Sequence, residues 1–337
     1  MGQIMGALGQ DGMNKIMLNN ALNIVESLPF LKDEEISLYQ SFIGTLRWGV
    51  ELGRIELTFA VSLMSRFSTA PRTDHMQKLL HMFSYIKRHL DSKLVFDAGT
   101  RDWSHINFLQ HDWNEFYPDA METMPPNAPE PRGRAVQLNM FCDAAHANDH
   151  VTRRSTTGLV IFILGTLILW YSKRQNTIET STFGSEFVAL RIAVELIEAL
   201  IDKLRMLGVP VEGPTNVLCD NKSVVTNSTE PASVLKKKHN AIAYHKVREA
   251  VAAGIIRVAH IKSHMNVADI LTKPLSPQAY YQILKWILFK RDSSENQGEL
   301  QEVLVTNRSQ TLLVIHKLPL PGIAIPFPGT YRQPSRN

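Results

Sequence analysis

The chain has 337 residues and 44% of them are hydrophobic, so it can build a sizeable core and is not expected to be disordered as a whole. Its formal net charge is +4 and its isoelectric point is about 9.0, a mildly basic balance that suits a polyanionic partner but is shared by many ordinary proteins. The longest apolar run, 158–170, is shorter than the roughly 20 residues of a membrane-spanning helix, and no secretion signal is visible, so we expect no membrane association.

The amino-terminal part of the chain is predicted to be helical. Residues 1–30 show no clear periodicity, and we assign them no function. From Leu38 to Leu90, apolar residues recur at the spacing of packed amphipathic helices. A generic helical module is one interpretation of this segment, and its place in a larger protein family, described below, is the other.

A proline-rich stretch follows the helical segment. Between Tyr117 and Arg134 lie the prolines Pro118, Pro125, Pro126, Pro129 and Pro131. Because proline removes backbone donors and stiffens the chain, we interpret residues 118–134 as a linker and place a domain boundary there. A second domain then starts near Ala135.

The second domain is predicted to combine strands and helices. Strands are expected at 136–143, 158–164, 167–172, 217–220 and 255–261. Helices are expected from Ser181 or Thr182 to Leu207, at 222–227, as a basic helix at 234–253, from about Val267, and at 278–290. This order implies a mixed sheet with helices on its faces. Residues 291–337 are rich in polar residues and then in proline, and they predict a weakly ordered tail.

Two of the predicted strands end on a carboxylate. Asp143 follows an apolar run that ends in Cys142, and Asp220 follows a run that ends in Cys219. If the strands are neighbours, the two acids form a pocket of like charge, which a proton or a cation must neutralise; a hard dication with oxygen ligands is the natural occupant. Each cysteine is expected to face the opposite side of the sheet from its acid, as a free buried thiol in a reducing compartment.

Two further acids fit the same pocket. Glu186 is the first member of an otherwise apolar helical stripe, so its side chain should point at the sheet rather than at water. Asp269 lies at the start of another apolar pattern, 268–271. For each acid taken alone, a solvated or salt-bridged carboxylate is the alternative interpretation.

Several short motifs occur in a fixed order around these acids. They are Arg153-Arg154-Ser155-Thr156-Thr157-Gly158, Trp170-Tyr171-Ser172-Lys173-Arg174-Gln175, Ser185-Glu186-Phe187-Val188-Ala189-Leu190, Cys219-Asp220-Asn221 and Ala268-Asp269-Ile270-Leu271-Thr272-Lys273-Pro274. Together they resemble the ribonuclease H region of the Pol polyprotein of copia-type LTR retrotransposons. The helical segment, with its runs 41–46 and 59–67, resembles the end of the reverse transcriptase of the same polyprotein.

The resemblance implies a fold class and a division of the chain. The fold class is α/β, with a ribonuclease H-like mixed five-stranded sheet and flanking helices, preceded by a mainly helical remnant of the reverse-transcriptase thumb and connection. Residues 1–117 would be that remnant, 118–134 the linker, 135–290 the ribonuclease H-like domain and 291–337 the tail. The chain lacks an Asp-Asp pair, so no polymerase activity is expected, and it looks like the carboxy-terminal piece of a polyprotein.

The resemblance also implies an activity: metal-dependent endonucleolytic cleavage of the RNA strand in RNA–DNA hybrids. Two Mg²⁺ ions, for which Mn²⁺ can substitute, would be held by Asp143, Glu186, Asp220 and Asp269, with Asp143 bridging both ions. Glu186 and Asp220 would complete one metal site and Asp269 the other. The family often carries a second acid two residues after the first, where this chain has Ala145. A catalytically inactive nucleic-acid-binding relic is therefore the alternative.

Other residues are candidates for catalysis or for binding the hybrid. His264 resembles a mobile histidine that some ribonucleases H carry before the last acid, with a surface histidine as the alternative. Candidates for contact with the nucleic-acid backbone are Ser172, Lys173, Arg174, Gln175, Lys236, Lys237 and Lys238, although three consecutive lysines are more often a solvated face. Other parts of the polyprotein are further expected partners, and the cytoplasm (in a virus-like particle) or the nucleus is the expected location.

Overall fold

The computed structural model describes residues 28–235, 240–289 and 312–313. Three sequence-based interpretations therefore lie outside the described residues. They concern the amino-terminal 27 residues, the three lysines at 236–238 and nearly all of the predicted tail. Every helix in the described part of the chain is too short or too polar to cross a membrane.

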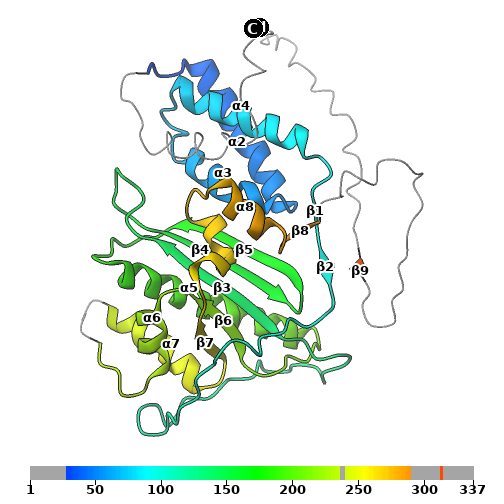
Figure 1. The fold of residues 1–337 in the computed structure, drawn as a ribbon, viewed down its shortest axis with the longest axis vertical. Helices are drawn as coiled ribbons and strands as arrows, with labels where there is room; N and C mark the ends of the chain where they lie inside the picture. The colour runs from blue at the N-terminus through cyan, green and yellow to red at the C-terminus, as the bar shows by residue number, and fades with distance from the viewer. Residues whose placement is uncertain (1–27, 236–239, 290–311, 314–337) are drawn as a thin grey trace, which may run out of the picture.

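The amino-terminal helical region is confirmed. It consists of α2 (Asp33–Glu51), the 3₁₀ helix η2 (Ile55–Leu57), α3 (Thr58–Ser65) and α4 (Thr73–Arg88). Apolar side chains of α2, α3 and α4, together with Leu57 of η2, pack into one core. This core includes the buried Leu46, Met64 and Leu79. The buried Tyr39 hydroxyl donates to the Met64 carbonyl at 2.8 Å, which ties α2 to α3. Figure 1 shows these helices in blue and cyan above the sheet.

A mixed five-stranded sheet forms the second region, as predicted. Its strands are β3 (Leu138–Ala145), β4 (Thr156–Ile163), β5 (Thr166–Arg174), β6 (Thr215–Cys219) and β7 (Ile256–His260), in the spatial order β5-β4-β3-β6-β7. The first three form an antiparallel meander, whereas β6 pairs parallel with both β3 and β7. This arrangement is the ribonuclease H-like topology that the motifs predicted. Two short additional pairs join β1 (Lys93–Leu94) to β8 (Leu288–Phe289) and β2 (Phe96–Asp97) to β9 (Leu312–Leu313).

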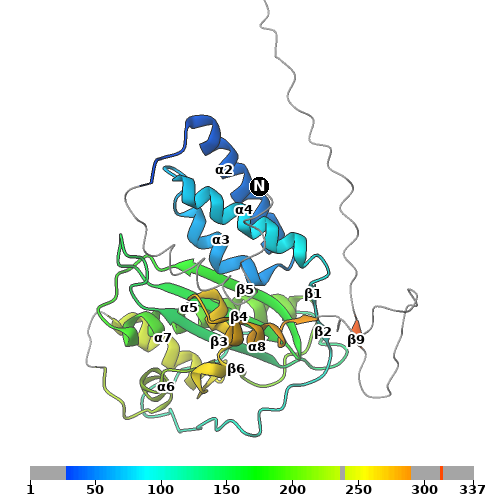
Figure 2. The ribbon, with the colours of Figure 1, turned by 45° about the horizontal axis from the view of Figure 1, so that its top comes forward.

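Helices cover both faces of the sheet and give the domain two cores. On one face, α5 (Thr182–Met206) and α7 (Ala241–Ala252) pack against alternate residues of the central strands, and α6 (Lys222–Thr229) follows β6. On the other face lie η5 (Val267–Leu271) and α8 (Pro277–Leu284), whose apolar residues pack on Phe141 and its neighbours; the short η4 (Ser263–Met265) precedes η5 in the chain. Figure 2 shows α5 and α8 on different sides of the sheet.

Two predicted helices differ from the structure. The basic helix is expected at 234–253, whereas α7 begins at Ala241; residues 236–239 lie outside the described part of the chain. The Arg248 guanidinium donates to the carbonyls of Glu230 and Pro231, and the Tyr244 hydroxyl donates to the Ser233 carbonyl at 2.5 Å. These two side chains therefore hold residues 230–233 against α7.

The last predicted helices also differ from the structure. The element at Val267 is the five-residue 3₁₀ helix η5, where the Asn266 side chain accepts from the Ala268 amide at its start. The final helix, expected at 278–290, is α8, which starts at Pro277 and ends at Leu284. Its start is fixed by Ser276, whose hydroxyl accepts from the Ala279 amide.

The helical region contacts the sheet along the β5 edge. Trp170 of β5 packs against apolar residues of both the helical region and the α8 face. The Tyr280 hydroxyl of α8 donates to the Glu56 carbonyl at 3.1 Å. Figures 1 and 2 show α3 beside β5. The two regions are therefore packed against each other, and the boundaries assigned to them along the chain remain predictions.

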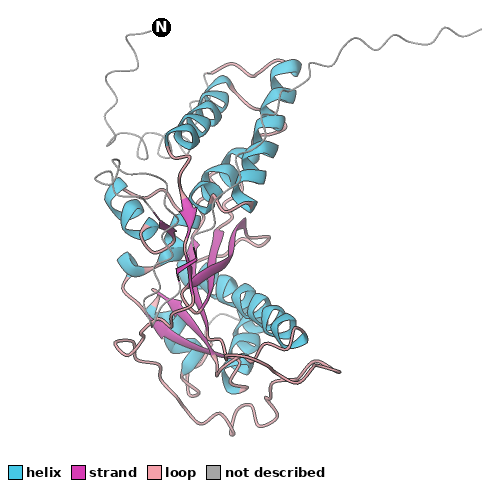
Figure 3. Cartoon of the chain, turned by 90° about the vertical axis from the view of Figure 1, so that its right-hand side faces the viewer, coloured by secondary structure: helices cyan, strands magenta, loops and turns pink. Residues whose placement is uncertain are grey.

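The segment 98–134 contains no helix or strand, and it runs along the end of the sheet away from the helical region (Figure 3). Its side chains are anchored on the helices of the second region. The Tyr117 hydroxyl lies 2.7 Å from His245 Nδ1, and the Glu122 carboxylate pairs with Arg205 at 2.7 Å. The predicted linker thus lies on the surface of the ribonuclease H-like domain.

Candidate metal centre

Three carboxylates meet at one edge of the sheet. Asp143 is in β3, Asp220 follows the last residue of β6, and Asp269 lies on η5. Carboxylate oxygens of the three residues lie within 4.8 Å of one another. The parallel pairing of β3 with β6 sets Cys142 opposite Cys219, so the acid that follows each cysteine reaches the same edge. The sequence prediction that these acids converge is consistent with the structure.

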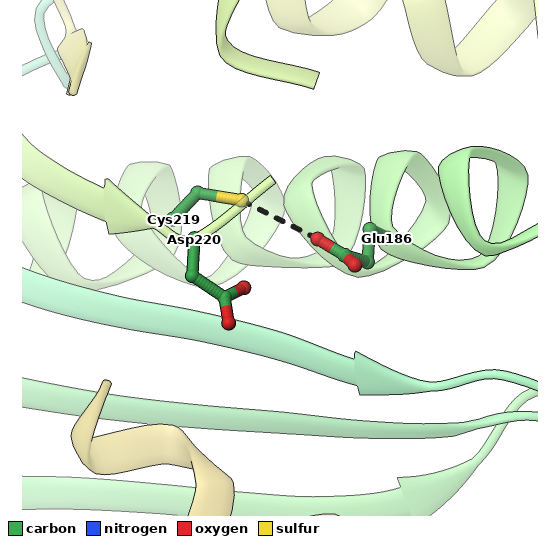
Figure 4. A group of neighbouring side chains, drawn as sticks. All are labelled: Glu186, Cys219 and Asp220. Carbon is green, nitrogen blue, oxygen red and sulfur yellow. Dashed lines mark hydrogen bonds between the residues drawn. The ribbon is translucent and has the colours of Figure 1, made fainter. Parts of the chain in front are cut away.

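The fourth acid approaches from α5. Glu186 offers a ligand atom within 4.8 Å of ligand atoms from Cys219 and Asp220. Figure 4 shows the Glu186 carboxylate extending from α5 toward the end of β6. The Asn221 side-chain amide donates to Glu186 Oε1 at 3.2 Å and holds the carboxylate in this direction. The apolar stripe on α5 therefore directs Glu186 toward the sheet, as its position in the sequence indicated.

Gly158 allows η5 to approach the sheet beside Asp143. Its partner in the antiparallel pairing of β3 and β4 is Asp143. A Cβ atom at position 158 would lie 2.4 Å from Thr272 Cγ2 and 2.9 Å from the Ala268 carbonyl oxygen. Only a glycine leaves room for this close contact, which brings Asp269 to Asp143.

Burial and mutual repulsion raise the pKa values of three of the clustered acids. Burial, followed by the nearby Asp220 and Asp143, raises the pKa of Glu186 to about 7. Burial, followed by Asp143, raises the pKa of Asp269 to about 7. Burial also raises the pKa of Asp143, against the opposing effects of Lys273 and Thr272. Protons or cations must therefore neutralise part of this charge near neutral pH.

Lys273 and Thr272 also belong to the site, although neither is among the predicted catalytic or metal-binding residues. Lys273 Nζ lies 2.9 Å from Asp269 Oδ1 and 3.7 Å from Asp143 Oδ2. The Thr272 hydroxyl donates to Asp143 Oδ2. The four-residue spacing between Asp269 and Lys273 was the available signal, because such a pair is within reach on one helical turn. That spacing does not predict the second contact of Lys273, with Asp143.

The two cysteines are free and buried, as expected. Cys142 packs in the core beneath α5, whereas Asp143 bonds Thr272 on the other side. Cys219 is the partner of Cys142 in the pairing of β3 with β6 and packs in the same core, where its sulfur is 3.6 Å from Glu186 Oε2 of α5 (Figure 4). Asp220 directly follows β6, and Figure 4 shows its carboxylate pointing in the opposite direction from the Cys219 thiol. Burial raises the pKa of the Cys219 thiol well above its usual value, so it is a thiol rather than a thiolate.

The donor set suits a hard divalent ion. Three carboxylates supply oxygen ligands around one point, and Glu186 adds a fourth beside it. Mg²⁺ and Mn²⁺ prefer oxygen ligands and need only a few carboxylates because they retain water. The pKa values of Glu186 and Asp269 are raised because their charged forms lack a neutralising partner, and a bound cation would favour their ionised forms.

The remaining predicted residues lie around this centre. His264 is exposed on η4. Ser172 donates to the Leu271 carbonyl at 2.6 Å, and the buried Gln175 donates to the Ser185 carbonyl at 2.7 Å. Arg174 pairs with Asp149, which leaves Lys173 as the exposed cation at the end of β5. The catalytic role of His264 and the binding role of 172–175 stay predictions.

Comparisons with known proteins agree with the motifs. The chain is 27% identical over 242 residues to the retrovirus-related Pol polyprotein from transposon RE1 of Arabidopsis thaliana, which covers 72% of this chain and 14% of that protein. It is 25% identical over 247 residues to the corresponding polyprotein from transposon TNT 1-94 of Nicotiana tabacum, covering 73% of this chain and 16% of the relative. The predicted resemblance to copia-type Pol polyproteins is confirmed, and the chain spans only about one seventh of such a polyprotein.

Among solved structures, the crystal structure of LC11-RNase H1 in complex with an RNA/DNA hybrid matches 42% of this chain and 99% of its own. The sequence identity is 20% and the TM-score is 0.34. No protein-family model matches the sequence.

Proposed function

We propose that this chain is a retrotransposon-derived ribonuclease H that cleaves the RNA strand of RNA–DNA hybrids with the help of divalent ions. The observation that supports it most directly is the convergence of Asp143, Asp220 and Asp269 within 4.8 Å, with Glu186 beside them. The similarity to Pol polyproteins, together with the ribonuclease H-like topology, supports the same activity.

Each acid would have a separate task. Asp143, in the centre of the sheet edge, would bridge two ions; Glu186 and Asp220 would complete one site, and Asp269 the other. Divalent ions held there would supply an activated water and stabilise the leaving oxygen of a phosphodiester. The protein's own contribution is to hold the carboxylates in place before binding: Thr272 fixes Asp143, and Asn221 fixes Glu186.

One observation favours the alternative, a relic that binds nucleic acid without cleaving it. Lys273 already compensates Asp143 and Asp269 with its own positive charge. The site can therefore be neutralised in part without a metal ion. The two candidate functions share a fold and differ only in whether ions are bound and hydrolysis follows.

A hybrid-cleavage assay separates the two candidates. The full chain is incubated with a hybrid whose RNA strand is labelled, in Mg²⁺, in Mn²⁺ and in EDTA. We expect cleavage of the RNA strand only with a divalent ion, and none by the Asp143→Asn variant, which loses a charge but little volume. Asp202→Asn, at an exposed position on α5, is the matched control and should cleave like the parent.

Cleavage that persists in EDTA, or in Asp143→Asn, would overturn the assignment of these acids. Hybrid binding without cleavage in either metal would support the relic. Primer extension by the chain would contradict the expectation that it lacks polymerase activity.

A further inference from the structure

The loop that joins β3 to β4, residues 146–155, is held in one unusual conformation. Ala147 and Arg153 have φ angles of 49° and 56°, which residues other than glycine adopt only when the surroundings enforce them. Asp149 supplies much of that enforcement, because its Oδ1 accepts from the amides of Val151 and Thr152 at 3.1 and 3.0 Å. The other carboxylate oxygen, Oδ2, is paired with Arg174 of β5.

Arg66 reaches this loop from α3 of the helical region. Its Nη1 lies 3.5 Å from Asp149 Oδ2, and its Nη2 donates to the Thr156 hydroxyl at 3.1 Å. The Arg66 side chain is only 13% exposed. A cation this deeply buried must keep its partners, so the contact fixes α3 against the start of β4. Figure 2 shows α3 next to the sheet at this edge.

From Thr156 a series of hydrogen bonds leads to the metal centre. The Thr156 hydroxyl donates to Asn148 Oδ1 at 2.9 Å, and Asn148 Nδ2 donates to the Thr272 carbonyl at 3.2 Å. The Thr272 hydroxyl donates to Asp143 Oδ2. The hydroxyl of Thr156 and the side-chain amide of Asn148 each accept a bond from the Arg66 side and donate one toward Asp143. Such aligned bonds polarise one another in a buried setting.

We propose that Arg66 is a positioning residue for the Asp143 carboxylate. It acts through Thr156, Asn148 and Thr272, so the helical region supports the metal centre rather than only adjoining it. The proposal rests on the proposed function in one respect, namely that Asp143 holds a divalent ion. Functional side chains must be held within about 0.5 Å of their productive positions, so the hydrogen bonds that fix Thr272 matter for the position of Asp143.

The test uses the full chain and measures Mn²⁺ affinity by the loss of the free-ion electron paramagnetic resonance signal. Arg66→Met removes the charge and both contacts but keeps the length of the side chain. Arg47→Met is the matched control: Arg47 lies in the same helical region, is exposed and contacts Ser65 instead. Thr156→Val interrupts the series at its next member, and the double variant Arg66→Met, Thr156→Val shows whether both residues act along one route. All measurements are made well below each variant's unfolding temperature.

Removing an indirect partner of a metal ligand typically weakens metal binding about 10–100-fold, and Arg66 is distant enough to fall near the lower limit. We therefore expect about a tenfold weaker Mn²⁺ affinity for Arg66→Met and for Thr156→Val, no further loss in the double variant, and no change for Arg47→Met. In the cleavage assay, kcat should fall in parallel while KM for the hybrid stays within about twofold, because the affected group holds the ion rather than the substrate.

Two results would overturn the inference: an Arg66→Met affinity equal to that of the parent, or losses that multiply in the double variant. A lower unfolding temperature with unchanged Mn²⁺ affinity would assign Arg66 a purely structural role. Failure of the proposed function gives a different result, because Asp143→Asn would then bind Mn²⁺ as the parent does.

Discussion

Replacing Lys273 with methionine tests how the carboxylates are neutralised in the absence of a metal. With an effective dielectric constant of about 20, unit charges separated by the two Lys273 distances, 2.9 and 3.7 Å, attract by about 6 and about 4.5 kcal/mol. The lysine side chain is 38% exposed, so solvent screening and its own desolvation reduce the net value strongly. We expect the substitution to cost about 1–2 kcal/mol of unfolding free energy in EDTA, which lowers the unfolding temperature by about 2–8 °C.

The same substitution should strengthen metal binding. In the parent, an ion that binds Asp143 and Asp269 must weaken their attraction to the Lys273 ammonium. Without that competing charge, the 1–2 kcal/mol should be recovered on binding, which corresponds to about a 5–30-fold tighter Mn²⁺ affinity. The destabilisation seen in EDTA should therefore disappear when Mn²⁺ is present.

Thermal unfolding in EDTA and in Mn²⁺, together with a direct Mn²⁺ titration, measures both effects. Lys246→Met is the matched control, because Lys246 pairs with Glu198 at 2.7 Å and is 36% exposed, but lies on α7 away from the acids. Its effect should be the same with and without metal. A Lys273→Met variant as stable as the parent in EDTA, or one that binds Mn²⁺ more weakly, would refute the reasoning.

Three further predictions follow from the same geometry. Because the pKa values of Glu186 and Asp269 are raised to about 7, the folded state is favoured when both acids are protonated. The stability of the metal-free protein should therefore be highest near pH 4 and fall as the pH rises through 7. Unfolding temperatures measured in EDTA should show this fall, and those measured in Mn²⁺ should not. Burial alone would raise the pKa of Asp149, but hydrogen bonds from Thr152 and Arg174 and the charge of Arg66 lower it to about 2. The ionised Asp149 should therefore contribute about 2 kcal/mol to the unfolding free energy above pH 4, and this contribution should be lost between pH 4 and 2. Urea unfolding of Asp149→Asn should show no such loss. Gly158→Ala should cost about 1–3 kcal/mol and weaken Mn²⁺ binding, because the new methyl group pushes η5 and Asp269 from the sheet; unchanged affinity in a titration would show that η5 yields without moving the acid.

The sequence predicted the sheet and the four acids because both rest on local patterns. Apolar runs that end in Cys142-Asp143 and Cys219-Asp220 indicate strands that deliver acids, and the stripe on α5 orients Glu186. The short apolar run at Asp269 could not distinguish an α-helix from the 3₁₀ helix η5, since five residues span hardly more than one turn of either.

Other features of the site depend on contacts between distant segments. Arg248 of α7 binds the carbonyls of Glu230 and Pro231, a contact that no helical periodicity reveals. The Arg66–Asp149 pair joins two segments that the sequence analysis placed in separate domains. Lys273 belonged to a motif quoted for its resemblance, but its position between two acids requires the packing of η5 against Gly158.

The mixed sheet has a consequence for the order in which the protein folds. The meander of β3, β4 and β5 uses only contacts between consecutive strands, whereas β6 and β7 join by crossovers through helices. Local contacts form faster than distant ones, so we expect the meander to form first, with Asp143 as its only member of the acidic cluster. Repulsion among the acids then opposes only the late steps, when Asp220 and Asp269 arrive. Divalent ions should therefore accelerate the end of refolding and leave its beginning unchanged, which pulsed hydrogen exchange during refolding can follow.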